Sequence, residues 1–306
     1  MTDSFRTLIS IVIPTYNHAH YLGNCLDSIL KQTHQNWEAI VVNNHSEDNT
    51  AEVVSSFPDP RIRMINFRNN GVIAASRNEG IRNSRGEFIA FLDSDDLWYP
   101  EKLERCFEQL ELGAELVCHG MRYVNKEGYQ KDVICGPAEK AEFLNLLYNG
   151  SCIIISASVV RKECLLRVHG FDENPAIVSS EDYDLWLKLS KEKIRFHFIE
   201  EVLGEYLCHS NNFSKQTLFH LQACLTVVNN HMSSLGEYTW LNGFKSRRIK
   251  ALFLYGAARS FQQKGKKQES LKFFWKSIVT FPFMLRIYIG IALNLLPTGL
   301  INKIRS

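Results

Sequence analysis

The chain has 306 residues, of which 45% are hydrophobic and 22% are charged, and its formal net charge is +2. This composition excludes collagen-like, low-complexity and wholly disordered chains, and the length allows one large domain or two modest ones. The near-neutral total argues against a dedicated nucleic-acid-binding protein. The charge is unevenly distributed, however, because residues 245–306 carry +12 and residues 1–244 carry −10.

The cysteines and the N-terminus bear on the cellular compartment. Eight cysteines are spread along the chain without a CxxC pair, which disfavours a zinc ribbon or a thioredoxin-type site. The first six residues lack the apolar core of a secretory signal. We therefore expect a cytoplasmic protein with free, mostly buried thiols.

Strands alternate with helices in the first third of the chain. Apolar runs predict strands over 8–14, 37–42, 61–67 and 87–92, and helical periodicity predicts helices over 20–32, 50–57, 71–84 and from Pro100 onward. This alternation predicts βαβ units and a parallel sheet. Ligands of such sheets bind beyond the carboxyl ends of the strands, so polar residues at those ends are the first candidates for a site.

Beyond residue 113 the pattern becomes less regular. It predicts strands over 115–125 and 151–160, a hairpin turn at 126–128, an amphipathic helix over 181–191, and two strands near 195–199 and 202–208. From about Lys215 only helices are expected, and residues 251–279 resemble one tetratricopeptide-type helical hairpin. The expected domains are residues 1–214 and a helical, basic region over 215–306.

Three polar clusters follow predicted strands: Pro14-Thr15-Tyr16-Asn17, Asn43 to Thr50, and Asp93-Ser94-Asp95-Asp96. Since the strands are predicted to be parallel, the clusters should share one rim of the sheet. Three carboxylates within four residues repel one another unless a cation neutralises them, and oxygen ligands suit Mg²⁺ or Mn²⁺. A solvated acidic turn that caps the next helix is the alternative, but the two neighbouring polar strand ends favour a metal site.

Five segments together resemble the family 2 glycosyltransferases of the GT-A fold. They are SIVIPTYNHAHYLGNCLDSIL at 10–30, WEAIVVNNHSEDNT at 37–50, NNGVIAASRNEGI at 69–81, GEFIAFLDSDDLWYPEKLE at 86–104 and GFDENPAIVSSEDYDLWLKL at 170–189. The resemblance spans about residues 10–210. It implies an α/β fold with a Rossmann-like, mostly parallel sheet flanked by helices. It also implies inverting transfer of a sugar from a nucleotide-diphospho-sugar to an acceptor hydroxyl, with Mn²⁺ or Mg²⁺ as cofactor.

The resemblance assigns a set of residues to the nucleotide. They are Pro14, Thr15, Asn17, Asn43, Arg77, Asn78, Asp93 and Ser94. Asn43 stands where the family usually has an aspartate that accepts the N3–H of uracil. An amide oxygen can accept the same bond without the charge-assisted part, so a uridine donor is expected but less strongly implied. Arg77 would approach the base or the diphosphate, and a surface arginine on a helix is the alternative.

The same resemblance assigns the metal ligands. Asp95 would bind the metal that bridges the diphosphate, Asp93 would face the ribose and the metal, and His209 is a further candidate ligand. Leu207 replaces the arginine of the family's Tyr-Arg-x-His pattern, which removes one phosphate contact. A loop histidine without a ligand role is the alternative for His209.

Asp182 is the expected general base, and Glu181 is expected to help position it. The alternative is a purely structural role in which both carboxylates only cap a helix, because a helix N-terminus favours negative charge by itself. Trp186 lies one helical turn beyond Asp182 and is expected in the core rather than stacked on a sugar.

The basic C-terminal region contains an apolar stretch over residues 283–301. Its unbroken apolar run from Ile287 to Leu296 is too short for a membrane span of about 20 residues. With Arg286, Lys303 and Arg305 beside it, the stretch indicates an interfacial helix at the inner face of a membrane. A helix packed on the domain is the alternative. No nucleic-acid-binding motif accompanies the basic residues, so no nucleic acid partner is expected.

The leading function is sugar transfer from a nucleotide-sugar donor to a glycan or lipid-linked acceptor in cell-surface polysaccharide or glycolipid synthesis. Two alternatives stay open. A nucleotidyltransferase acting on sugar phosphates would need a glycine- and arginine-rich loop after the first strand, where Pro14-Thr15-Tyr16-Asn17-His18 stands instead. A sugar-nucleotide or glycan-binding protein that has lost catalysis agrees with Asn43 and Leu207, but disagrees with the intact Asp93, Asp95 and Asp182.

Overall fold

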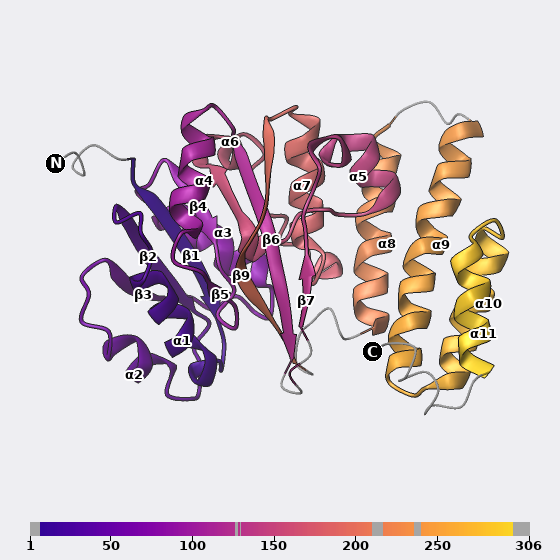
Figure 1. Cartoon of the computed structure of the whole chain (residues 1–306), viewed down its shortest axis with the longest axis horizontal. Helices are drawn as coiled ribbons and strands as arrows, with labels where there is room; N and C mark the ends of the chain where they lie inside the picture. The colour runs from indigo at the N-terminus through magenta and orange to yellow at the C-terminus, as the bar shows by residue number, and fades with distance from the viewer. Residues whose placement is uncertain (1–6, 126–127, 129, 210–216, 236–239, 296–306) are drawn as a thin grey trace. The chain divides into compact units, whose positions relative to one another are not determined.

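The structure is a computed structural model that describes residues 7–125, 128, 130–209, 217–235 and 240–295. The chain divides into two compact units, one of residues 1–146 with 151–210 and one of residues 147–150 with 211–306 (Figure 1). The boundary expected at residue 214 lies outside the described residues.

The first unit is built on a sheet whose described strands follow the order β3-β2-β1-β4-β8-β6-β9-β5, with β7 paired to β6. The strands are β1 (Ile9–Thr15), β2 (Trp37–Asn43), β3 (Ile62–Asn66), β4 (Phe88–Phe91), β5 (Leu97–Trp98), β6 (Leu116–Asn125), β7 (Gln130–Val133), β8 (Ser158–Arg161) and β9 (Phe196–Cys208). The helices are α1 (Ala19–Leu30), α2 (Thr50–Ser55), α3 (Ile73–Asn83), α4 (Lys102–Glu111), α5 (Phe143–Asn149), α6 (Lys162–Arg167) and α7 (Glu181–Lys191), and the last three residues of α5 belong to the second unit.

The first four strands confirm the predicted parallel arrangement. β1 pairs in parallel with both β2 and β4, and β2 pairs in parallel with β3. Thr15 lies opposite Asn43 at the carboxyl ends of β1 and β2. Every residue of β1, β2 and β4 is buried, as expected for strands covered on both faces by helices.

The other half makes the sheet a mixed one. β8 runs antiparallel to both β4 and β6, β6 runs parallel to β9, and β7 forms the expected hairpin partner of β6. The strand expected over 151–160 starts only at Ser158, because residues 155–157 form a 3-10 turn. Within this turn, Ser156 accepts hydrogen bonds from the backbone N–H of Asp93 and from Nε1 of Trp98.

The two strands expected near 195–199 and 202–208 are one strand, β9. Its pairing with β6 shifts register around His119 and Gly120, opposite residues 199–202. The polar pair Glu200 and Glu201 therefore marks an irregularity inside a strand rather than a turn between two strands. Such irregularities bend a strand without ending its pairing.

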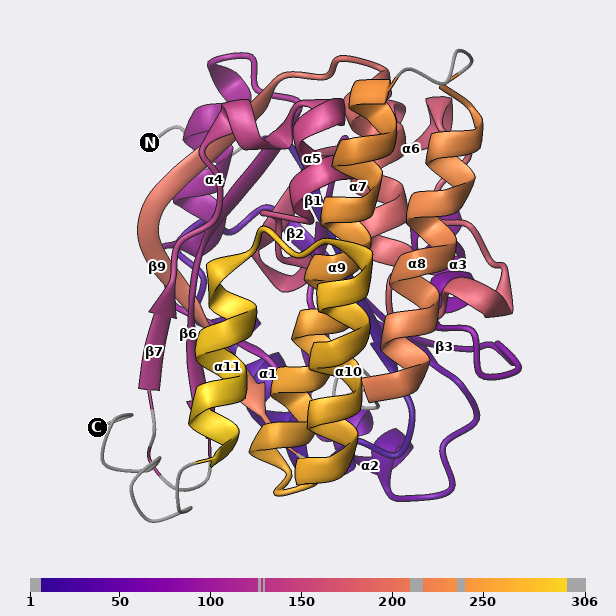
Figure 2. The same ribbon diagram turned by 90° about the vertical axis from the view of Figure 1, so that its right-hand side faces the viewer.

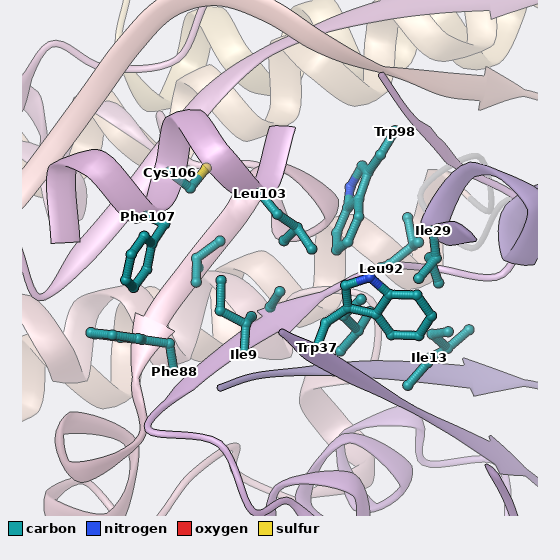
Figure 3. Packing of buried hydrophobic residues seen from close by; sticks show 14 of the residues in the cluster. Ile9, Ile13, Ile29, Trp37, Phe88, Leu92, Trp98, Leu103, Cys106 and Phe107 are labelled. Carbon is teal, nitrogen blue, oxygen red and sulfur yellow. The ribbon is translucent and has the colours of Figure 1, made fainter. Parts of the chain in front are cut away.

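The core of the first unit fills the space between the sheet and the helices α1 and α4. Figure 3 shows Trp37 and Trp98 packed among aliphatic side chains, with Phe88 and Phe107 nearby. Ile9, Ile11 and Ile13 of β1 belong to this cluster, as the side-chain alternation of a strand requires. This continuous apolar layer supports the strands whose ends carry the polar clusters.

The second unit consists of helices in its described part: α8 (Thr217–Ser233), α9 (Trp240–Gln263), α10 (Lys267–Thr280) and α11 (Leu285–Leu295). Figure 2 shows α9, α10 and α11 side by side. The predicted helical hairpin is confirmed as α9 and α10, although α9 begins earlier than expected. Gly265 takes a positive φ of 71° in the turn between them.

One face of α11 packs within the second unit. A Cβ on Gly290 would lie 2.5 Å from the ring of Phe274, and Asn294 Nδ2 donates to Ser270 Oγ at 3.1 Å. Ile287 is fully buried. Lys303 and Arg305 lie outside the described residues. No helix in the part of the chain that the structure describes is long and apolar enough to cross a bilayer.

Gly80→Ala tests the close packing of α3 on β1. A Cβ at Gly80 would lie 2.3 Å from Cγ1 of the fully buried Val12, so the substitution overpacks the core. We expect the free energy of unfolding in urea to fall by about 1–3 kcal/mol. The control is Gly23→Ala in α1, where the nearest atom is Val53 Cγ1 at 4.0 Å. It should leave stability unchanged or raise it by up to about 1 kcal/mol. Equal stability of the two variants would contradict the packing.

Candidate active site

The loops after β1 and β2 are tied together at the rim of the sheet. Asn17 takes a positive φ of 52°, a conformation that asparagine tolerates better than most residues. Its backbone N–H donates to Ser46 Oγ at 2.9 Å, and its Oδ1 accepts from the backbone N–H of Glu47 at 2.8 Å. Asn17 thus holds the two loops in one arrangement.

Asn43 is 4% exposed and is the centre of a second hydrogen-bond group. Its Oδ1 accepts from the backbone N–H of Ser46 at 3.0 Å and from Ser46 Oγ at 2.7 Å, and its Nδ2 donates to Asn66 Oδ1 at 2.9 Å. The backbone N–H can only donate, so it fixes which amide atom is the oxygen. Both lone pairs of this oxygen are used by Ser46. A base N–H can therefore bind it only if the Ser46 hydroxyl moves.

The acidic cluster after β4 separates into two partly exposed carboxylates and one buried one. The side chains of Asp93 and Asp95 are 25% and 11% exposed, whereas Asp96 is 1% exposed. Burial, with the nearby charges of Asp95 and Asp93, raises the pKa of the Asp96 carboxyl. Asp96 Oδ1 accepts from the backbone N–H of Leu207 at 3.2 Å. Asp96 therefore fastens β9 to the turn, whereas Asp93 pairs with Arg77 and Asp95 with His209.

Arg77 connects this cluster to α7. Its Nη2 lies 2.8 Å from Asp93 Oδ1 and its Nη1 lies 2.5 Å from Glu181 Oε1, while only 3% of the Arg77 side chain is exposed. Burial alone would lower the pKa of the guanidinium, but Asp93 and Glu181 raise it above its usual value. The alternative of a surface arginine is wrong. A buried arginine paired with two carboxylates is a strong link between the elements that carry them.

Asp182 is the second residue of α7, directly after Glu181, and is half-buried. Burial and the neighbouring charge of Glu181 raise the pKa of the Asp182 carboxyl to about 7, against the opposing effect of Arg77. Its Oδ1 accepts from the backbone N–H of Tyr183 at 2.7 Å. A carboxyl group that titrates near neutral pH is suited to proton transfer. Helix capping alone does not explain this environment.

His209 lies against Asp95, with Nε2 2.7 Å from Oδ2. The ring of Tyr21 stacks on His209 at a centroid distance of 5.1 Å, and His18 lies edge-on at 6.2 Å. His18 Nδ1 in turn lies 2.9 Å from Ser94 Oγ. The structure thus brings His209, which is distant in sequence, to the acidic cluster, and packs aromatic rings around it.

A cation is compatible with this donor set. In the described residues no three His, Cys, Asp or Glu side chains form a ready cage for a metal ion. Mg²⁺ and similar hard cations commonly need only one or two protein carboxylates, because substrate phosphates supply the other oxygens. Asp93 and Asp95 provide such carboxylates, and His209 contacts the second of them.

Two other residues that were expected to contact the nucleotide make structural contacts within the protein. Asn78 Nδ2 donates to the backbone oxygen of Phe171 at 2.9 Å and to Glu173 Oε1 at 2.8 Å, and its Oδ1 accepts from Phe171 N–H. Asn78 therefore braces the loop that leads into α7. Pro14 lies inside β1 and pairs with Val42. Trp186 is fully buried, which confirms its expected place in the core.

Sequence reasoning missed several residues of the site. His18 and Tyr21 follow β1 without a spacing that indicates a site, and only the fold brings them to Ser94 and His209. Tyr123 of β6 and Tyr206 of β9 lie opposite each other and stack at a centroid distance of 4.6 Å. Burial is the main cause of the raised pKa of Tyr123, and nearby groups that include Asp96 add to it. No periodicity along one strand reveals such a pair.

Residues 10–167 match the model of glycosyl transferase family 2. An Escherichia coli UDP-Glc:alpha-D-GlcNAc-diphosphoundecaprenol beta-1,3-glucosyltransferase is 35% identical over 69% of this chain and 79% of that protein. An uncharacterised glycosyltransferase of Rickettsia conorii is 30% identical over 76% of this chain. The match spans only 39% of that Rickettsia protein's length.

Two solved structures share the fold at low sequence identity. Staphylococcus aureus TarS 1–349 in complex with UDP-GlcNAc has a TM-score of 0.63 and 18% identity, covering 93% of this chain and 84% of that one. The mannosyltransferase PcManGT from Pyrobaculum calidifontis, in complex with GDP-Man and Mn²⁺, has a TM-score of 0.61 and 17% identity, covering 96% and 82%. Together with the sequence match, they establish that the chain belongs to glycosyltransferase family 2 and has the GT-A fold.

Proposed function

We propose that the protein is an inverting glycosyltransferase that moves a sugar from a UDP-sugar to an acceptor hydroxyl in cell-surface polysaccharide or glycolipid synthesis. The observation that carries the proposal is the double ion pair of Arg77. It joins Asp93, at the rim where a nucleotide binds in such sheets, to Glu181, the neighbour of Asp182. A carboxyl group with a pKa near 7 thereby lies close to the donor side of the site.

The proposed roles follow from this arrangement. Asp182 accepts the proton of the acceptor hydroxyl as the hydroxyl oxygen attacks C1 of the sugar, on the face opposite the diphosphate. The bond between C1 and the phosphate oxygen breaks, and its electron pair stays on the diphosphate. The transition state has oxocarbenium character, as in other substitutions at an anomeric carbon. Mn²⁺ or Mg²⁺ held by Asp93 and Asp95, with His209 beside them, would neutralise charge on the diphosphate.

The proposed donor and acceptor classes are supported by similar proteins. The Escherichia coli relative is named for a UDP-glucose donor and a diphosphoundecaprenol-linked acceptor, and TarS was solved with UDP-GlcNAc. A hexosyl or N-acetylhexosaminyl group on UDP is therefore the proposed donor, and a glycan or lipid-linked sugar the proposed acceptor. Family membership removes the alternative of a nucleotidyltransferase. The remaining alternative is a glycan-binding protein without turnover, and the sugar-transfer assay of the native protein distinguishes it from an enzyme.

We further propose a cytoplasmic enzyme that meets the inner face of the membrane peripherally through its basic C-terminal helices. Residues 245–306 carry +12, and anionic lipid attracts such a surface. This contact would bring the enzyme to a lipid-linked acceptor.

Asp182→Asn removes the proposed base. We expect UDP binding to stay unchanged and sugar transfer to fall by about 10²-fold or more, the usual contribution of a positioned base. The measurement is transfer from a panel of UDP-, GDP- and dTDP-sugars to a lipid-diphosphate-linked acceptor, with a separate UDP titration. Glu192→Gln, an exposed change just beyond the other end of α7, is the control. Near-normal transfer by Asp182→Asn would reject the assignment, and no turnover by the native enzyme with any donor would favour a binding protein.

The pKa of Asp182 predicts a pH profile. Because the base must be deprotonated, kcat/KM should rise with pH and level off above an apparent pKa near 7. Glu181→Gln removes a neighbouring negative charge that raises this pKa, so the rising limb should move to lower pH. Glu192→Gln should leave it in place. A limb that moves to higher pH in Glu181→Gln would show that Glu181 does not act on Asp182 through its charge.

Asp95→Ala tests the metal site. We expect the Mn²⁺-dependent part of UDP binding, measured by calorimetry with and without EDTA, to be lost, because a diphosphate and a cation bind together at such carboxylates. Asp27→Ala, at an exposed position of α1, is the matched control and should bind like the native protein. Unchanged Mn²⁺-dependent titration of Asp95→Ala would contradict the metal assignment.

A further inference from the structure

The second unit exposes large apolar side chains that its own core does not use. Leu271, Trp275 and Val279 recur at every fourth residue along one face of α10, and Trp275 and Val279 are 65% and 69% exposed. Phe283, four residues after Val279, and Leu285, at the start of α11, are 77% and 74% exposed. Isolated apolar residues on a surface are ordinary, but a run at helical spacing that continues into the next segment indicates an interaction surface. We call these five residues the apolar stripe.

The fold of the unit does not require the apolar stripe. The opposite face of α10 supplies Phe273 and Phe274 to the core, and Ser270 and Ser277 donate to backbone oxygens of α9 at 2.9 Å and 2.7 Å. α11 packs on Phe274 through Gly290. Apart from Phe283, whose ring lies edge-on to the core residue Phe281 at a centroid distance of 5.5 Å, the packing needs of both helices are met on faces other than the stripe. Substitutions in the stripe should therefore leave the unit folded.

Positive charge accompanies the stripe. Lys272 and Lys276 lie on the exposed face of α10 next to Trp275, and Arg286 follows Leu285. Glu269 is the sole acidic residue among residues 245–306 of the sequence. The partner surface must therefore be negatively charged and must also accept tryptophan, phenylalanine and aliphatic side chains. Basic residues beside such side chains on a helix are typical of helices that lie in a membrane interface.

The stripe itself offers a partner little besides apolar contact. Apart from the indole N–H of Trp275, its side chains carry no hydrogen-bonding group, so they offer little to fix the orientation of a protein partner. Over the residues that the structure describes, α10 has 14 residues and α11 has 11, and neither length is enough to span a bilayer. Helices that lie parallel to the membrane plane do not need to span the bilayer, and their basic residues can reach the lipid phosphates.

We propose that the apolar stripe inserts into the boundary between headgroups and acyl chains of an anionic bilayer, with Lys272, Lys276 and Arg286 at the phosphate level. The proposal rests on the peripheral membrane contact included in the proposed function and specifies the residues that make it. It does not depend on the transfer chemistry, since membrane binding can be measured without donor or acceptor.

The test uses the full chain and vesicles of phosphatidylcholine with 25 mol% phosphatidylglycerol. We expect the protein to co-sediment with them, and the tryptophan emission to shift to shorter wavelength. The shift is measured in a Trp240→Phe background. Trp37, Trp98 and Trp186 are buried, so they should contribute little to this shift, and Trp275→Phe in that background should remove most of it. Vesicles of phosphatidylcholine alone should bind at least 10-fold less protein. Equal binding to both vesicles, or no binding to either, would overturn the proposal.

Two double variants separate the stripe from exposed apolar residues in general. Trp275→Ser with Val279→Ser should weaken vesicle binding at least 10-fold. Leu112→Ser with Leu166→Ser, at positions 82% and 57% exposed in the first unit, should bind like the native protein. Equal binding by the two double variants would refute the assignment of the stripe.

A third double variant and the donor reaction complete the test. Lys272→Gln with Lys276→Gln should reduce the preference for anionic vesicles, and an undiminished preference would refute the charge contribution. Hydrolysis of the donor in solution should be unchanged in the stripe variant. If donor hydrolysis is absent from every protein while the stripe dependence holds, the transfer proposal fails and the membrane proposal stands. If donor hydrolysis is normal but vesicle binding does not depend on the stripe, the membrane proposal fails and the transfer proposal stands.

Discussion

The site depends on the two ion pairs made by the buried guanidinium of Arg77. Arg77 pairs with Asp93, 16 residues away at the end of β4, and with Glu181, 104 residues away at the start of α7. Removing either carboxylate would leave part of a buried charge without compensation, which is costly in a protein interior. Arg77 therefore fixes the distance between the acidic rim and α7. Asn78, the next residue of α3, strengthens the same link through Phe171 in the loop before α7.

This arrangement gives neighbouring carboxylates different chemistry. Glu181 pairs directly with Arg77, whereas Asp182 keeps a raised pKa because burial and the charge of Glu181 outweigh the attraction of Arg77. In the acidic cluster Asp96 is buried and serves the backbone of β9, whereas Asp95 stays near the surface beside His209. One stretch of acidic sequence thus holds a structural residue and a candidate ligand. Pairs of titratable groups with divergent environments are characteristic of catalytic sites.

The formal charge of +2 is the sum of two parts of the chain that carry opposite net charge. The −10 of residues 1–244 includes the carboxylates of the rim, and the +12 of residues 245–306 includes the lysines beside the apolar stripe. An acidic rim needs a cation to accept a diphosphate, and a basic helix surface attracts anionic lipid. The distribution of charge thus says more about function than its total.

The sequence by itself determined the parallel strands β1 to β4, the helix that begins at Glu181 and the polar rim, because each of these is encoded by local periodicity or by residues next to a strand end. It also placed Trp186 in the core. Only the tertiary structure decided that Arg77 is buried, that residues 196–208 form one strand, and that His18, Tyr21 and His209 meet. These features depend on contacts between segments far apart in the chain. A local pattern carries no information on which distant charge or ring will face it.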